Sequence, residues 1–147
     1  MPPHLSVPRW FRWLLVVLWC AFIFHATSSP AYSGDHTQQD VAAVLPTAGA
    51  PAVHWLNLAV RKASHLFAFG TLGALAAWAL TGASWRTAAA WAFATLYAAS
   101  DEFHQSFVPG RTAEVWDVFL DSAGALLFIL VATAAARRRR VARWERD

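Results

Sequence analysis

The sequence predicts an all-α integral membrane protein, a bundle of about four transmembrane helices with both termini in the cytoplasm. Of its 147 residues, 57% are hydrophobic and 14% are charged, whereas soluble domains carry roughly 25% charged residues. The apolar residues are grouped in long blocks, and an apolar run of about 18 or more residues can cross the hydrocarbon layer as a helix. The length predicts a single domain, residues 1–147.

The first expected span covers residues 10–26 and follows Arg9. A secretory signal peptide has the same basic start, an apolar core of this size and small residues after it. We favour a retained helix, because the three tryptophans of this segment are typical of interfacial and packing aromatics rather than of a signal core. Cys20 is the only cysteine of the chain, so no intramolecular disulfide can form.

Residues 28–51 are expected to form a loop. Five prolines and glycines punctuate this segment, and its central part is polar. At roughly two dozen residues it exceeds ordinary connections, so it is either functional or mobile, and we favour mobile. Residues 53–59 are expected to form a short interfacial helix with one apolar side.

Three further spans are expected at residues 62–80, 85–100 and 116–136. The earliest of these contains small residues, including Gly70 and Gly73, which let helix backbones approach closely where lipid gives no hydrophobic drive for association. A turn at Gly82 separates it from the alanine-rich span that follows. We therefore expect a compact bundle that ends in a basic cytoplasmic tail, residues 137–147.

The positively charged residues predict the orientation of this bundle. Four spans place both termini and the Gly82 turn on one side of the membrane. That side carries most of the arginines, namely Arg9, Arg12, Arg86, the run Arg137–Arg140, Arg143 and Arg146. The positive-inside rule assigns it to the cytoplasm and places residues 101–117 at the outer face. A basic run after an apolar segment is typical of contact with anionic headgroups, so we predict a membrane lipid partner and no nucleic acid.

The segment from Tyr97 to Asp121 contains most of the polar residues that could carry chemistry. Asp101, His104 and Gln105 are spaced at i, i+3 and i+4, which places them on one face of a helix, whereas Glu102 points elsewhere. The candidates at the start of the last span and at the outer end of the second span are Asp117, Asp121, Lys62 and His65. We expect the bundle to bring these three helix ends together, with Arg111 as the cation nearest to the acids.

A purely structural role explains part of this pattern. Asp117 can cap the last span or interact with its dipole, and Arg111 can pair with Glu114 or Asp117. Asp121 lies further into the apolar segment, where an isolated charge costs at least about 2.5 kcal/mol. It therefore requires a partner such as Lys62, Arg111 or His65. Because ionisable groups are rare inside membranes without a role, we favour a binding or catalytic site over a salt-bridge network.

Four kinds of chemistry can be considered for these residue types: metal binding, acid–base catalysis, nucleophilic catalysis and phosphate binding. A metal set of His65, His104, Asp101, Glu102 and Asp117 lacks close ligand spacing, so we predict no metal and no cofactor. Acid–base catalysis would use His104 beside the carboxylates Asp101, Glu102 and Asp117. Ser100 or Ser106 could act as a nucleophile only with a base in reach. A lipid phosphate could be held by Lys62, His65 and Arg111, with Gln105 and Asp121 in the same binding site.

The polar residues also carry a family resemblance. The pattern is Lys62-x-x-His65-x-x-x-Phe69, then Asp101-Glu102-Phe103-His104-Gln105-x-Phe107-Val108-Pro109-Gly110-Arg111, then Asp117-x-x-x-Asp121-x-x-Gly124. It resembles the VanZ-like family over about residues 61–130. The resemblance implies a small membrane protein of the bacterial envelope, located in the cytoplasmic membrane. The family takes its name from a protein linked to teicoplanin resistance. Many of its members carry Asn where this chain has Asp121.

Two functions remain open from the sequence. The first is an outer-face site that binds or acts on an anionic envelope molecule, such as a lipid-linked phosphate or a glycopeptide-related ligand. The second is a non-catalytic structural or partner-binding protein whose polar cluster is a salt-bridge lock. An apolar groove or a lid beside the cluster would favour the first, and a closed, fully paired cluster would favour the second.

Overall fold

The computed structural model describes residues 7–111 and 113–144, apart from the side chains of residues 140 and 143. Its secondary structure over this part of the chain consists of helices without any strand, as predicted. The elements in order are α1 (Arg9–Ser28), the 3-10 helix η1 (Pro30–Tyr32), α2 (Gly34–Val44), α3 (Ala50–Ala79), α4 (Arg86–Gln105) and α5 (Val115–Trp144).

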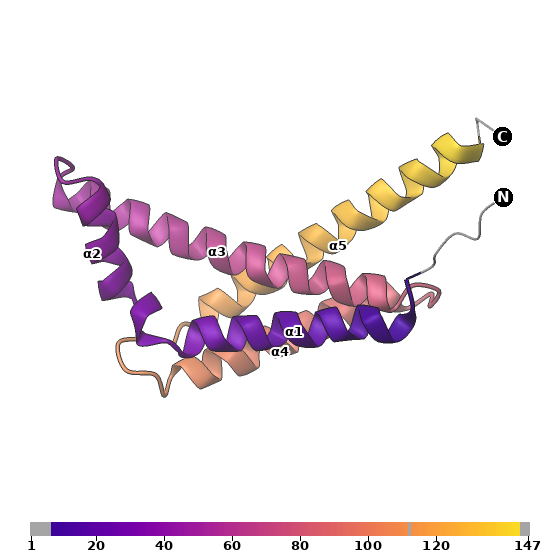
Figure 1. Cartoon of the computed structure of the whole chain (residues 1–147), viewed down its shortest axis with the longest axis horizontal. Helices are drawn as coiled ribbons and strands as arrows, with labels where there is room; N and C mark the ends of the chain where they lie inside the picture. Colours follow the sequence, from indigo (N-terminus) through magenta and orange to yellow (C-terminus); the bar gives the residue numbers. More distant parts are fainter. Residues whose placement is uncertain (1–6, 112, 145–147) are drawn as a thin grey trace.

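Helix α3 is the centre of the fold and contacts α1, α2, α4 and α5. The start of α1, the turn between α3 and α4 and the C-terminal end of α5 lie at one end of the molecule, on the right of Figure 1. Helix α2, the end of α4 and residues 106–111 lie at the other end, and the last part of α5 extends away from its neighbours. The long helices therefore run alternately between the two ends.

Two of the described helices are long and apolar enough to cross a membrane. They are α1 over its full length and α5 over Val115–Arg139. Both expose many large hydrophobic side chains, among them Val17 at 61%, Phe22 at 55% and Val131 at 60% of full exposure. Such exposure is normal for a surface that faces lipid but would be an unusually large apolar patch in water.

The predicted loop at residues 28–51 is wrong, because most of it is helical. Helix η1 and helix α2 occupy it, with Asp35 in the first turn of α2, where a carboxylate suits the helix dipole. The separate short helix at 53–59 is also wrong. It belongs to the 30-residue α3, which starts with Pro51 in its first turn and meets no further Pro or Gly until Gly70.

Small residues let α3 and α5 approach closely. A Cβ built on Gly73 would lie 3.0 Å from the carbonyl oxygen of Ala125, and one on Gly124 would lie 2.8 Å from the carbonyl oxygen of Leu66. The predicted close approach is therefore confirmed at Gly73. Tight packing of these two helices fixes the relative positions of the polar residues of α3 and α5, such as Lys62 and Asp117.

Candidate functional site

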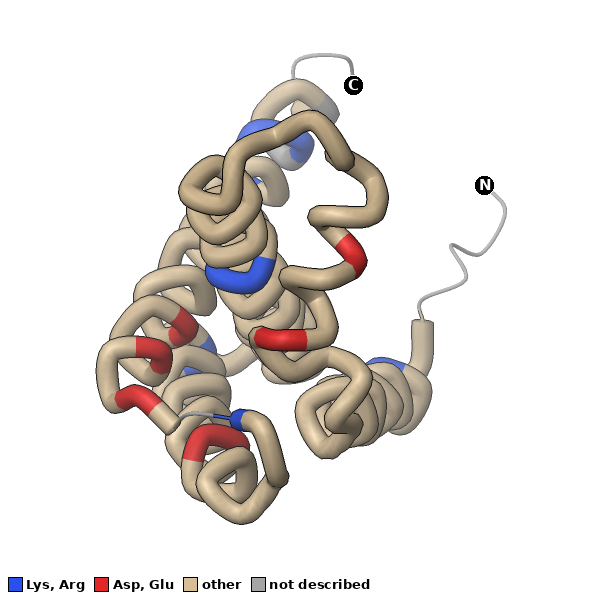
Figure 2. The backbone as a smooth tube through the Cα atoms, turned by 90° about the vertical axis from the view of Figure 1, so that its left-hand side faces the viewer, with Lys and Arg blue, Asp and Glu red and all other residues tan. Residues whose placement is uncertain are grey.

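The carboxylates of the protein gather at one end of the bundle. Every Asp and Glu that the structure describes lies within residues 35–40 or 101–121. Figure 2, viewed from this end, shows these positions around the basic positions of α3 and of the segment before α5. The predicted meeting of the three helix ends is therefore confirmed, and α2 joins them as a fourth element.

A chain of hydrogen bonds runs from α1 through α4 to Arg111. Thr27 Oγ1 donates to Asp101 Oδ1 at 2.6 Å, and Gln105 Nε2 donates to Asp101 Oδ2 at 2.8 Å. The guanidinium of Arg111 donates to Gln105 Oε1 at 3.3 Å and to the carbonyl oxygen of Ala26 at 3.2 Å. The i, i+4 spacing of Asp101 and Gln105 thus serves to orient Arg111.

Asp101 and Glu102 are both buried, at 4% and 7% exposure. Glu102 accepts the backbone N–H of Glu114 and so holds the start of α5. Burial raises the pKa of both carboxyls, because removal from water disfavours the charged form, and their hydrogen bonds oppose this shift. The two neighbours therefore fasten two different segments to the end of α4.

Lys62 of α3 is the cation that neutralises the start of α5. Its ammonium pairs with Asp117 and lies 3.6 Å from Glu114 Oε2. The expectation that Arg111 pairs with these two carboxylates is wrong. Arg111 follows α4 and turns toward α1, whereas Lys62 projects from α3 toward the first turn of α5.

Asp121 has the partner that its burial requires. It is 2% exposed, and its Oδ2 lies 3.3 Å from Nδ1 of His65. The prediction of a basic or histidine partner is therefore confirmed. The second oxygen, Oδ1, has no hydrogen-bond partner among the described residues.

The remaining candidates for catalysis face α1 or their own helix. His104 Nε2 lies 2.9 Å from Ser28 Oγ, and the His104 ring lies 4.5 Å from that of Phe24, centroid to centroid. The hydroxyls of Ser100 and Ser106 each donate to a backbone carbonyl three residues earlier. Within residues 7–111 and 113–144, no group of three or more His, Cys, Asp or Glu side chains is arranged to hold a metal.

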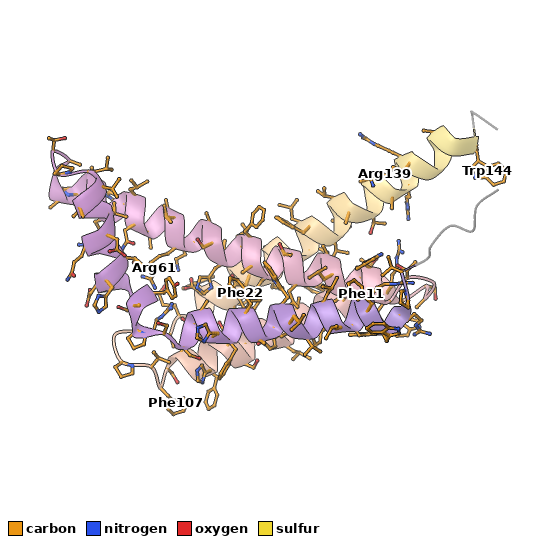
Figure 3. The ribbon with its side chains drawn as sticks, in the orientation of Figure 1. Phe11, Phe22, Arg61, Phe107, Arg139 and Trp144 are labelled. Carbon is orange, nitrogen blue, oxygen red and sulfur yellow. The ribbon has the colours of Figure 1, made fainter. Side chains whose placement is uncertain are left out.

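A cavity of about 440 Å³ opens beside the polar network, between α1, α2 and α3. Its walls are mainly apolar and include Phe22, Ile23, Ala68 and Phe69. Figure 3 shows Phe22 between α1 and α3, and Arg61 in the angle that α2 makes with these two helices. A second cavity of about 370 Å³ continues toward α2 and is lined by polar side chains such as Gln38 and His54.

Three residues line both cavities, namely Asn57, Arg61 and Arg111. Neither guanidinium forms an ion pair with any carboxylate that the structure describes. Arg111 Nε is buried without an acceptor, and Oδ1 of Asn57 is buried without a donor. Burial, together with the nearby charge of Arg61, lowers the pKa of Arg111. The junction of the cavities is thus rich in unsatisfied groups, which suits an anionic, hydrogen-bonding ligand.

The structure divides the predicted site residues into two groups. His65 and Arg111 line the first cavity. The others lie behind or beside it in the polar network and are Lys62, Asp101, Glu102, His104, Gln105, Asp117 and Asp121. Sequence reasoning missed Arg61 and Asn57 as site residues. Their position on the helical face that leads to His65, at intervals of four residues, is the signal that could have revealed them.

A family model described as VanZ/LLP1 matches residues 11–136. This match is wider than residues 61–130, the region that carries the sequence motifs, since it also includes α2 and α1 from residue 11 onward. No curated protein and no solved structure matched the chain. A family model that covers this much of the chain settles its membership, and the protein therefore belongs to the VanZ/LLP1 family.

Proposed function

We propose that this VanZ/LLP1 protein binds an anionic molecule of the cell envelope at the outer face of the bacterial cytoplasmic membrane. The observation that carries the proposal is that Arg61 and Arg111 both line the apolar cavity and the polar cavity, and neither forms an ion pair with a described carboxylate. Buried or half-buried arginines are normally paired, and a phosphate or carboxylate group would supply the missing acceptors.

The proposal includes four membrane spans with cytoplasmic termini. The alternation of α1, α3, α4 and α5 between two ends supports it (Figure 1), as does the concentration of arginines at the end that holds the start of α1. Reporter fusions after Gly82, after Gly110 and near the C-terminus test this orientation. We expect only the Gly110 fusion to report the outer side, and a cytoplasmic Gly110 would overturn the location of the site.

The polar network supports the site rather than reacting with its ligand. Asp101 and Gln105 orient Arg111, while Lys62 holds α3 against the start of α5. None of the four predicted acid–base residues Asp101, Glu102, His104 and Asp117 lines either cavity. Binding therefore accounts for the geometry without a catalytic step.

The salt-bridge lock remains a second candidate, favoured by the contacts of Lys62 with Asp117 and Glu114. It describes the α3–α5 side of the cluster well. It does not account for the apolar cavity or for the two arginines beside it. Ligand binding is therefore the better description of the end of the molecule that holds both the polar network and the cavities.

Native mass spectrometry of the protein extracted from its own membrane tests the proposal. We expect a co-purifying anionic lipid that is lost in Arg61→Ala and Arg111→Ala and retained in Arg9→Ala, an exposed arginine at the start of α1. Arg111→Lys keeps the charge but loses the planar fork, so it should retain part of the binding. Equal lipid content in all four variants would refute the proposal.

A link to glycopeptide resistance of the teicoplanin type is the physiological part of the proposal and rests on family membership. If the bound molecule takes part in this response, cells that produce Arg61→Ala or Arg111→Ala should be as sensitive to teicoplanin as cells without the protein. Normal membrane abundance of each variant is the control. Unchanged resistance in both variants would separate the site from the drug response.

A further inference from the structure

The two cavities follow one another along the molecule, with the two arginines between them. This order matches a ligand with three parts: an apolar chain, a charged group and a polar headgroup. Along α3, the first cavity is lined from Asn57 to Phe69, and its part beyond Arg61, eight residues of helix, covers about 12 Å. Its walls become apolar away from the arginines, in the direction of the bundle interior. The second cavity lies on the opposite side of the arginines, next to α2, and is polar. An amphiphile in the outer leaflet has the same order of apolar chain, charge and polar headgroup.

The polar cavity is lined by side chains that can accept hydrogen bonds. Asn57 is 5% exposed, and its Nδ2 donates to the carbonyl oxygen of Gly34 at 3.1 Å, which identifies Oδ1 as the acceptor. That oxygen has no donor among the described residues. Asp35 and Gln38 add further acceptors to the same cavity. A bare alkyl phosphate is mainly a dianion at neutral pH and has no hydroxyl in that form, so most of its molecules would leave Asn57 unsatisfied.

From these observations we infer that the ligand is a lipid with a hydrocarbon chain and a phosphodiester that carries a hydroxylated headgroup. This inference rests on the proposed function and narrows its ligand class. The chain occupies the apolar cavity, Arg61 and Arg111 contact the phosphodiester, and a headgroup hydroxyl donates to Asn57 Oδ1. The inference excludes a phosphomonoester lipid and a water-soluble phosphate as the preferred ligands.

Three monoanionic probes separate the three parts. Dodecylphosphoglycerol has a chain, a phosphodiester and hydroxyls, dodecyl propyl phosphate lacks the headgroup hydroxyls, and methyl phosphoglycerol lacks the chain. Binding is measured with the full-length protein in zwitterionic nanodiscs, corrected for partition into empty nanodiscs. We expect dodecyl propyl phosphate to bind about tenfold more weakly than dodecylphosphoglycerol, since one hydrogen bond to a buried group is at stake. Methyl phosphoglycerol should bind more weakly still.

Variants with matched controls assign each part to its cavity. Ala68→Phe fills the apolar cavity and should weaken both dodecyl probes but not methyl phosphoglycerol, whereas Ala63→Phe, on the exposed face of α3, should change nothing. Asn57→Ala should abolish the preference for glycerol over propyl. Because Asn57 also fastens α2, Gln38→Ala is a second test of the preference for glycerol over propyl. Its control is Gln39→Ala, a substitution of the exposed neighbouring residue.

The outcomes distinguish this inference from the proposed function. If glycerol and propyl probes bind equally to the unmodified protein, the headgroup assignment is wrong. If Ala68→Phe and Ala63→Phe behave alike, the chain assignment is wrong. In both cases the proposed function stands as long as Arg61→Ala and Arg111→Ala abolish binding. If those two variants bind all probes normally, the proposed function itself fails.

Discussion

On the α3–α5 side of the polar end, cationic and acidic side chains contact one another, while on the α1–α3 side two guanidiniums face a cavity. Lys62 and His65 each contact a carboxylate of α5. Arg61, one residue before Lys62, forms no ion pair with a described carboxylate. Neighbouring positions on one helix thus serve opposite purposes, since a step of one residue turns a side chain by about 100° around the axis.

This difference teaches that the number of charges does not locate a binding site. On the paired side, which we call the closed side, the charged side chains already contact oppositely charged ones. A ligand would have to compete with these contacts to bind there. The open side keeps one unsatisfied donor, Arg111 Nε, and one unsatisfied acceptor, Asn57 Oδ1, beside apolar walls, a combination typical of ligand pockets. The following experiments test whether the two sides are as independent as their contacts suggest.

The largest effect is expected from breaking the buried pair of the closed side. His65→Leu leaves Asp121 buried without its partner, which should cost on the order of 3 kcal/mol of stability. The double variant His65→Leu with Asp121→Leu should recover most of that loss. Thermal unfolding in detergent and abundance in the membrane are the measurements. A single variant as stable as the unmodified protein would show that the contact does not hold α3 and α5 together.

A smaller loss is expected where the same helices touch through their backbones. Gly124→Leu would drive side-chain atoms into the carbonyl of Leu66 and should destabilise the protein by about 1–3 kcal/mol. Ala123→Leu, on the exposed face of α5, is the matched control and should be close to neutral. If the two variants unfold at the same temperature, close packing is not what fixes the closed side.

These two experiments concern the part of the fold that the sequence could predict. Long apolar blocks and small residues are local patterns, and they correctly indicated the all-α class and the close approach at Gly73. The helix in residues 34–44 was missed because its composition is polar and flanked by turn residues. Its packing against α3 is a tertiary effect that no local pattern reveals.

In the candidate site, too, local sequence patterns predict some contacts of single residues and not those that depend on tertiary packing. Burial of Asp121 in an apolar segment was enough to predict a partner, because an unpaired charge there is too costly. The choice between Lys62 and Arg111 as the partner of Asp117 was not predictable, since both are cations near the same helix end. The importance of Arg61 depends on the cavity beside it, which only the packing of α1, α2 and α3 creates.

The link between the two sides can be tested through the residues that orient Arg111. Gln105→Leu removes one of the two acceptors of the Arg111 guanidinium and should weaken binding of an anionic lipid about tenfold, the equivalent of one lost charged hydrogen bond. Thr27→Val also removes a donor to Asp101 but leaves the contacts of Arg111 in place. Although Thr27 lines the first cavity, valine has nearly the same volume, so this variant is the matched control. Equal loss of binding in both would indicate a general disturbance rather than misorientation of Arg111.

The smallest effect concerns pH and the carboxyl of Glu102. Burial raises the pKa of this carboxyl, so the folded protein holds the proton more tightly than the unfolded chain does. Its contribution to stability is therefore fully present below the unfolded pKa of about 4.3 and is lost as the pH rises through the folded pKa.

Glu102→Gln keeps an oxygen that can accept the N–H of Glu114 but cannot titrate. We expect its unfolding temperature to change less than that of the unmodified protein as the pH is raised above about 4. Because the pKa of Asp101 is raised in the same direction, the variant should lose only part of the pH dependence. The comparison from the closed side is the same measurement on Glu114→Gln. Glu114 is a half-exposed carboxylate that lies 3.6 Å from the ammonium of Lys62. A pH profile that Glu102→Gln leaves unchanged would mean that this carboxyl carries the same charge in the folded and unfolded protein.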